Sequence, residues 1–78
     1  MKTIRIYGAD WCSDCIVAKN FLTSRKIKFE YIVITENEEA IEFVEKINNG
    51  KRIIPTIEID GEIYTNPGIK KLMEIIKQ

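Results

Sequence analysis

The sequence predicts an α/β domain in which a four-stranded mixed sheet is flanked by three helices, in the order β-α-β-α-β-β-α. Three observations predict it. The chain has 78 residues, for which one domain is the default, so residues 1–78 are taken as a single unit. Apolar residues make up 45% of the chain, which suits a packed core. Short runs of strand-like residues are interleaved with longer runs of helical period.

The first half of the chain has the pattern of a strand, a helix and a second strand. Residues 2–7 alternate between polar and apolar side chains, which is typical of a strand. From residue 12 to residue 25 apolar residues lie four apart, which predicts a helix with one buried stripe. The pairs on this stripe are Val17 with Phe21 and Ala18 with Leu22. Residues 29–34 are mostly aromatic or β-branched and predict a second strand, parallel to the first.

A second helix is predicted next. Thr35 and Glu38 have the spacing of a capping box, in which two side chains bond the free backbone N–H groups at a helix start. The apolar residues that follow at helical spacing are Ala40, Phe43, Val44 and Ile47. Asn49-Gly50 then predicts the end of this helix.

A hairpin and a third helix complete the prediction. Residues 53–59 and 62–65 have the composition of two strands, and the residues 60–61 between them are the Asp-Gly signal of a type I′ turn. Asn66 is expected to cap the last helix, with Pro67 at its first position. The stripe expected to be buried on this helix consists of Ile69, Leu72, Met73 and Ile76.

Charge and hydropathy argue against several classes of protein. The 12 basic residues balance the 12 acidic ones, so no basic excess favours nucleic acid or a membrane surface as a partner. No stretch approaches the roughly 18 consecutive apolar residues of a membrane span. The start of the chain turns polar too soon for a signal peptide. We therefore expect a cytoplasmic protein that acts as a monomer.

The stretch Trp-Cys-Ser-Asp-Cys at residues 11–15 carries the candidate chemistry. In a reducing compartment a close cysteine pair is more often catalytic or metal-binding than structural, and so short a loop gains little stability from a disulfide. Cys12 is expected at a helix N-terminus, where free N–H groups stabilise a thiolate. Cys15 lies one turn further, beside Ala18 and Leu22, and is expected to be shielded. Thiol–disulfide exchange requires such an exposed attacking sulfur and a shielded second one.

Neighbouring side chains modify this interpretation. Asp10 and Asp14 place negative charge near Cys12, which favours thiol and disulfide over thiolate and predicts a more reducing couple. The alternative left open is that Asp10 caps the helix and Asp14 is solvated. Trp11 is expected to be exposed and able to cover a bound thiol or peptide; the alternative is that it packs on the loop. The chain has no histidine, so the proton of Cys15 must pass to water, to a departing thiolate or to the attacking thiol.

Together with Ile54-Pro55-Thr56, the motif at residues 11–15 resembles the thioredoxin-fold families. Over nearly its full length the chain is similar to short, single-domain glutaredoxins. Residues 47–50 and 64–67 resemble the mycoredoxin branch, whose members reduce mixed disulfides between proteins and low-molecular-weight thiols. The resemblance implies a thioredoxin-like fold and a cis proline that faces the attacking sulfur, with the preceding backbone pairing with substrate as an added strand. The alternative is an ordinary edge proline.

The resemblance also implies roles for individual residues. Cys12 is the nucleophile and Cys15 the resolving cysteine. The residues expected to bind substrate are Trp11, Arg52, Ile54, Pro55, Thr56, Thr65 and Asn66. We expect no metal ligands and no tightly bound cofactor, with a low-molecular-weight thiol retained as a co-substrate.

Two departures from glutathione-using glutaredoxins leave a glutathione pocket in question. Ser13-Asp14 stands where those proteins usually have Pro-Tyr or Pro-Phe, and residues 65–68 replace their Gly-Gly and polar cluster. Arg52 either pairs with a carboxylate of a thiol ligand or is a solvated loop charge.

The leading functional interpretation is a dithiol–disulfide oxidoreductase of the electron-carrier type. It would reduce protein disulfides or mixed disulfides of proteins with low-molecular-weight thiols, with a thiol or a reductase as electron donor. An alternative is a glutaredoxin-like protein that binds an iron–sulfur cluster shared between two subunits, with two cysteines from each. A redox-inert binding module is a third class, against which the intact Cys12, Cys15 and Pro55 argue.

Overall fold

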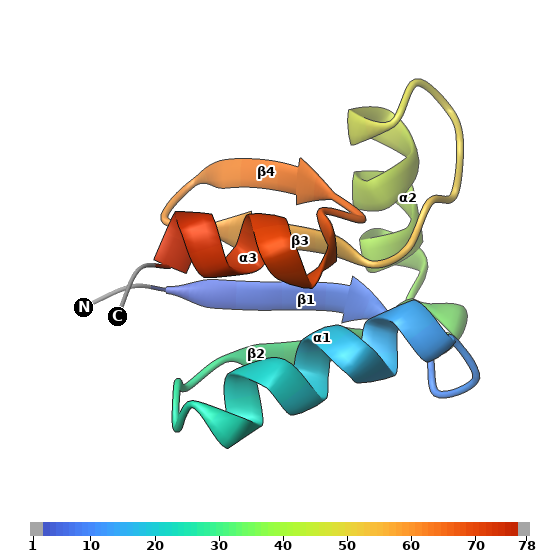
Figure 1. Cartoon of the computed structure of the whole chain (residues 1–78). Helices are drawn as coiled ribbons and strands as arrows, with labels where there is room; N and C mark the ends of the chain where they lie inside the picture. Colours follow the sequence, from blue (N-terminus) through green and yellow to red (C-terminus); the bar gives the residue numbers. More distant parts are fainter. Residues whose placement is uncertain (1–2, 77–78) are drawn as a thin grey trace.

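The structure, a computed structural model, describes residues 3–76. Along this part of the chain the elements are β1 (Ile4–Gly8), α1 (Ser13–Ser24), β2 (Glu30–Val33), the 3₁₀ helix η1 (Ile34–Glu36), α2 (Glu38–Ile47), β3 (Thr56–Ile59), β4 (Glu62–Thr65) and α3 (Gly68–Ile76) (Figure 1). The predicted order of elements is confirmed; the predicted start of the first strand at Lys2 lies outside the described residues. None of the described helices is long and apolar enough to cross a bilayer.

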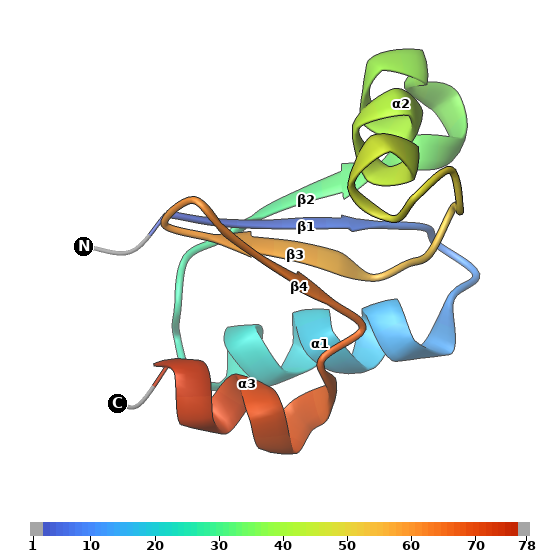
Figure 2. The ribbon, with the colours of Figure 1, turned by 90° about the horizontal axis from the view of Figure 1, so that it is seen from above.

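The strands form one mixed sheet in the order β2-β1-β3-β4. β1 is parallel to β2 and antiparallel to β3, and β3 is antiparallel to β4. Figure 2 shows α1 and α3 on one face of the sheet and α2 on the other. The end of β1, the start of α1 and the loop from α2 to β3 meet at the same end of the molecule (Figure 1). This end is where the cysteine motif lies.

Each face of the sheet has its own apolar core. The cluster between the sheet and helices α1 and α3 consists of Ile4, Ile6, Ala18, Leu22, Ile57, Ile59, Leu72 and Ile76. The cluster beneath α2 consists of Tyr7, Ile34, Ala40 and Val44. Alternation along β1 explains the division, because successive side chains of a strand point to opposite faces. Ile6 therefore joins the first cluster and Tyr7 the second, where its ring centroid lies 4.8 Å from that of Phe43.

The start of α2 differs from the prediction. Thr35 lies in η1 and caps nothing; the N-cap is Asn37, whose Oδ1 accepts the backbone N–H of Ala40 at 3.0 Å. The 3₁₀ turn carries Ile34 into the core, where it is 1% exposed. The extended backbone that a cap requires therefore comes only at Asn37, with φ of −135°.

The third strand is shorter than predicted and the hairpin is as predicted. β3 begins at Thr56 rather than at residue 53. The proline before it has no N–H to donate to a neighbouring strand, so regular pairing starts after Pro55. Asp60 and Gly61 have φ of 50° and 87°, which fits the predicted type I′ turn and explains the glycine there.

Three details of the helices also differ. α3 begins at Gly68, so Pro67 is outside it, and Asn66 has φ of 43° rather than the extended backbone of a cap. Val17 and Met73, expected in buried stripes, are 49% and 47% exposed. Each of these two residues is next in sequence to a buried residue. Because neighbouring residues lie about 100° apart around a helix, their side chains fall outside the narrow face that meets the core.

Candidate functional site

Cys12 lies where the chain leaves the sheet and enters α1. It is the N-cap residue of this helix, with φ of −87° and ψ of 112°. Its Sγ accepts the backbone N–H of Cys15 at 3.2 Å, so a sulfur takes the place of the oxygen that usually caps a helix. The predicted position at a helix N-terminus is confirmed, and the alternative in which Asp10 is the cap is wrong.

Burial distinguishes the two sulfurs, neither of which is in a disulfide. Cys15 has no exposed surface, as predicted, whereas Cys12 is 9% exposed. The expectation of a freely exposed attacking sulfur is therefore corrected. Cys12 is largely covered because it packs with Ala9 and Cys15 in a small cluster against which Ile54 also lies. Of the two cysteines, Cys12 is the one that reaches the surface.

The environment of Cys15 keeps its thiol protonated. Burial raises the pKa of the Cys15 thiol to about 12, and its hydrogen bond with Cys12 acts in the same direction. The neighbouring Ala9 backbone and Tyr31 hydroxyl act in the opposite direction and lower the pKa by a smaller amount. At neutral pH Cys15 is therefore a thiol, and it does not compete with Cys12 as a nucleophile.

The proline segment lies directly against the cysteine cluster. The Ile54–Pro55 peptide bond is cis, as the resemblance implied, and Ile54 packs against Ala9, Cys12 and Cys15. Pro55 is buried, and its carbonyl accepts the backbone N–H of Asn66 at 2.7 Å. This bond fixes the end of β4 to the proline.

A hydrogen-bonded network centred on Asn48 holds the loop from α2 to β3. Its Nδ2 donates to the carbonyl of Val44 at 2.8 Å and to Oγ1 of Thr56 at 3.3 Å. Its Oδ1 accepts the hydroxyl of Thr65 at 2.8 Å. Thr56 in turn donates to the carbonyl of Ile53 at 2.7 Å. The network connects α2, the loop before β3 and β4, and it uses the carbonyl of Ile53 but no backbone group of Ile54.

The predicted binding residues lie at different depths around the sulfurs. Trp11 is 74% exposed, which confirms its expected exposure and excludes packing on the loop. Thr65 and Asn66 are also exposed. Thr56 has no exposed surface, so the prediction that it lines the binding edge is wrong for its side chain. The hydroxyl instead holds the loop, because a buried polar group needs a partner within the protein.

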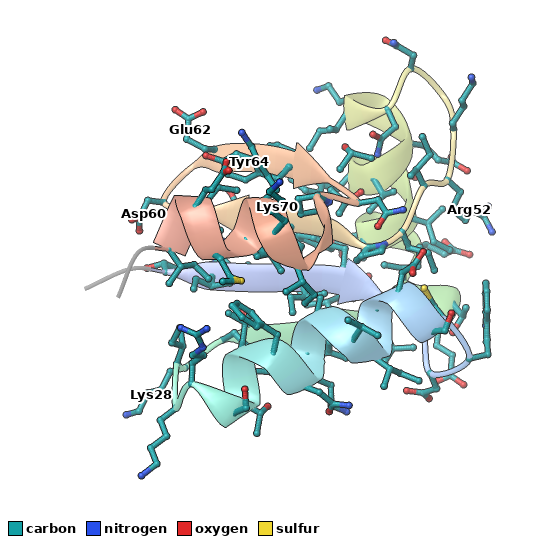
Figure 3. The ribbon with its side chains drawn as sticks, in the orientation of Figure 1. Lys28, Arg52, Asp60, Glu62, Tyr64 and Lys70 are labelled. Carbon is teal, nitrogen blue, oxygen red and sulfur yellow. The ribbon has the colours of Figure 1, made fainter. Side chains whose placement is uncertain are left out.

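Arg52 forms an ion pair on the surface. Its Nε and Nη2 both lie 3.2 Å from Oε2 of Glu45. Figure 3 shows Arg52 pointing outward at the end of the molecule where α1 begins. An exposed pair of this kind contributes little to stability, so the guanidinium can exchange Glu45 for another carboxylate at small cost.

A cavity of about 250 Å³ lies between α1 and the start of α3. Its lining residues include Asp14, Val17, Pro55, Asn66, Ile69 and Leu72. Because Asp14 and Pro55 belong to the cysteine motif and the proline segment, the cavity adjoins the candidate site. The sequence predicted that Val17 is buried in the core. The structure instead places this apolar side chain in the cavity wall beside the cysteine motif.

Sequence reasoning also missed Tyr31. Its hydroxyl donates to the carbonyl of Ala9 at 2.7 Å. A Cβ built on Gly8 would stand 2.8 Å from Sγ of Cys15 and 2.9 Å from the Tyr31 oxygen, so the two groups share the space that this glycine leaves open. Burial, followed by the charge of the nearby Cys15, raises the pKa of Tyr31 to about 12. The available signal was strand register, which pairs Tyr31 with the inward-facing Ile6.

A metal site of ordinary composition is not formed by the described part of the chain. Within residues 3–76 no group of three or more His, Cys, Asp or Glu side chains is placed to hold a metal ion. The iron–sulfur alternative requires two subunits, each contributing Cys12 and Cys15, and it stays a prediction.

Comparison with known proteins gives a consistent result. Residues 4–64 match the family model described as glutaredoxin. A candidate glutaredoxin of Mycobacterium tuberculosis is 38% identical over 65 residues, which are 82% of this chain and 77% of the relative. Mycoredoxin 1 of Corynebacterium glutamicum is 37% identical over 68 residues, 86% of this chain and 84% of the relative. The crystal structure of a variant of a thioredoxin-like protein, 26% identical, superposes with a TM-score of 0.85 over 99% of this chain and 97% of that one. The predicted thioredoxin-like fold is thereby confirmed.

Proposed function

We propose that this chain, which belongs to the glutaredoxin family, is a dithiol–disulfide oxidoreductase of the electron-carrier type. The observation that carries the proposal is the arrangement of its two sulfurs. One sulfur caps a helix and reaches the surface, and the other is buried one turn behind it. The backbone N–H of the second cysteine already bonds the first sulfur at 3.2 Å. Such a pair supports an ordered reaction in which the accessible sulfur attacks first.

In the first step the Cys12 thiolate attacks one sulfur of a substrate disulfide. A bond forms between Cys12 and this sulfur, and the other half of the substrate leaves as a thiolate that takes up a proton. The hydrogen bond from the Cys15 backbone and the partial positive charge at the start of α1 support the anionic nucleophile. Asp14, in the first turn of the same helix, opposes this effect and favours a more reducing couple.

In the second step Cys15 loses its proton and attacks Sγ of Cys12. The Cys12–Cys15 bond forms, and the bond between Cys12 and the substrate breaks. The electron pair of the broken bond leaves with the substrate thiolate, which becomes a thiol by taking up a proton. The substrate has then gained two electrons and the protein has lost two. A low-molecular-weight thiol or a reductase, the proposed electron donor, restores the dithiol.

The proposed substrates are protein disulfides and mixed disulfides of proteins with low-molecular-weight thiols. Among the described residues, no hydrogen bond occupies the backbone N–H or carbonyl of Ile54, which lies beside the sulfurs. An extended substrate segment can therefore pair there as an added strand, while the exposed ring of Trp11 covers it. We propose that Thr65, Asn66 and Arg52, which are exposed, form part of the same binding surface.

The setting of the proposed reaction follows from the cysteine pair. A dithiol that must return to its reduced form suits the reducing cytoplasm, where we place the protein as a monomer. The proposal includes no tightly bound cofactor, and neither nucleic acid nor membrane as a partner, in keeping with the balanced charge of the chain.

A reduction assay tests this function with two substrates, a protein disulfide and a peptide carrying glutathione as a mixed disulfide. Cys12→Ser is expected to lower both activities to the uncatalysed rate. Cys15→Ser is expected to abolish turnover of the protein disulfide, because the first mixed disulfide is not resolved. Ser13→Ala, an exposed position between the two cysteines, is the matched control and should retain activity. Full activity of Cys12→Ser would end the redox proposal, and full activity of Cys15→Ser would end the dithiol mechanism.

A further inference from the structure

The second step of the proposed reaction requires a thiolate in a place that disfavours charge. Cys15 has no exposed surface, and burial raises the pKa of its thiol to about 12. The inward residues of β1, Ile4 and Ile6, are apolar and offer neither a base nor a donor. A polar side chain next to this sulfur is that of Tyr31, which has no role in the two steps of the proposed reaction.

We propose that the hydroxyl of Tyr31 is a catalytic hydrogen-bond donor to the Cys15 thiolate during the resolving step. The inference rests on the proposed function and adds a reacting group to it. Three observations carry it. The sulfur and the hydroxyl share the space beside Gly8, and the hydroxyl donates a hydrogen bond to the carbonyl of Ala9. Tyr31 also packs against the cluster of Ala9, Cys12 and Cys15.

Gly8 brings the two groups together. The position of its absent Cβ lies 2.8 Å from the Cys15 sulfur and 2.9 Å from the Tyr31 oxygen. These distances are too short for a real Cβ, so any other residue at position 8 would force the sulfur, the hydroxyl or both to move. The backbone φ of Gly8 does not lie in the left-handed region, so the local turn does not demand a glycine here. The close approach of the Cys15 and Tyr31 side chains therefore explains why position 8 is a glycine.

The hydroxyl of Tyr31 can serve both protonation states of Cys15. A phenol has one hydrogen to donate and lone pairs to accept with. In the dithiol the hydrogen goes to the carbonyl of Ala9 at 2.7 Å, which leaves the oxygen free to accept the Cys15 S–H. When Cys15 loses its proton, rotation about the C–O bond turns the hydrogen toward the sulfur. The backbone N–H of Ala9 is the second donor to the same thiolate.

Tyr31 is a donor in this scheme and never a base. Its own pKa is raised to about 12 by burial, so it keeps its proton at neutral pH. The Cys15 proton passes to the departing substrate thiolate or to solvent, the sulfur electron pair forms the bond to Cys12, and the Tyr31 proton ends where it began. The other titratable groups that face this pair are Cys12 and Asp10 from the loop, and Lys19 from α1, whose Nζ lies 5.1 Å from the ring centre.

The test separates the two steps with glutathione disulfide as the probe and Trp11 fluorescence in a stopped-flow instrument as the signal. Tyr31→Phe is expected to slow the resolving step about ten- to one-hundredfold at neutral pH. This factor corresponds to the free energy that a hydrogen bond to a charged group usually contributes. In a Cys15→Ser background the same substitution should leave the first step unchanged.

Two further variants keep the test decisive. Tyr64→Phe removes the hydroxyl of a half-buried tyrosine in β4 and should leave both steps unchanged. Gly8→Ala keeps the Tyr31 hydroxyl but separates it from the sulfur, and it should slow the resolving step alone. The proposal is overturned if Tyr31→Phe and Gly8→Ala both resolve at the wild-type rate, or if both steps slow equally. Absence of the first step in the unaltered protein would instead refute the proposed function, and this inference with it.

Discussion

The two sides of the site are held in different ways. On the cysteine side, Cys15 is buried and Tyr31 is half-buried against the same cluster, and the pKa of each is raised to about 12. On the proline side, the amide of Asn48 ties the loop to β4, and Arg52 ends in an exposed ion pair. In the proposed reaction, burial therefore controls when the second sulfur reacts. Side-chain hydrogen bonds, in contrast, hold in place the backbone that is proposed to bind substrate.

The largest expected effect is a loss of unfolding free energy at high pH, which originates on the cysteine side of the site. Burial raises the pKa of Cys15 from about 9 to about 12, so the folded protein keeps a proton that the unfolded chain releases. The stabilising contribution is therefore complete below about pH 9 and is lost as the pH rises toward 12, by a few kcal/mol. Tyr31 acts in the same direction from about pH 10 upward, because its pKa is also raised.

Urea unfolding of the reduced protein between pH 7 and pH 11 measures this effect. Cys15→Ser should remove the part of the decline that begins near pH 9 and leave the part of the tyrosine decline that burial of Tyr31 causes. Cys12→Ser is the matched control, since it keeps the buried thiol. Equal slopes for all three proteins would show that burial of Cys15 does not control its proton.

A smaller effect is expected from the proline side. Asn48→Ala removes the side-chain hydrogen bonds to Val44, Thr56 and Thr65, and with them the link between α2, the loop before β3 and β4. We expect a loss of about 1–3 kcal/mol of unfolding free energy, with slower reduction of protein substrates because the loop is no longer fixed. Chemical denaturation and the reduction assay measure the two consequences. Asn20→Ala, at an exposed position of α1, is the control; equal behaviour of the two variants would refute the role of the network.

The smallest expected effect concerns charge at the start of α1. Asp14 lies in the first turn of α1, and we predict that its negative charge destabilises the reduced form of the couple. Asp14→Asn should make the couple more oxidising by about 10–20 mV, the size expected for one exposed charge near a helix end. Equilibration with glutathione redox buffers measures the potential. Glu74→Gln removes an exposed charge from α3 and should not move it; a downward shift in Asp14→Asn would contradict the assignment.

Much of this arrangement was predictable from local pattern. Alternation and helical spacing identified the strands and helices, and the position of the C-x-x-C motif between the first strand and the first helix placed Cys12 at a helix start. The resemblance to thioredoxin-fold families supplied the cis bond before Pro55.

The remainder depends on contacts between distant parts of the chain. Tyr31 meets Cys15 only because β2 pairs with β1 in one register and Gly8 leaves room between them. Thr56 is buried because the proline loop turns it toward Ile53 and Asn48, which no spacing in the sequence records. The same holds for the η1 turn, where burial of a core residue overrode a plausible capping box.

The central claim is that the helix-capping sulfur reacts first and the buried sulfur second. Its most direct test is to treat Cys15→Ser and Cys12→Ser proteins with glutathione disulfide at neutral pH and to locate the adducts by mass spectrometry of digested peptides. We expect one stable glutathione adduct on Cys12 in the first variant and an unmodified Cys15 in the second. An adduct on Cys15 that forms as fast as the one on Cys12, or no adduct on either, would contradict it.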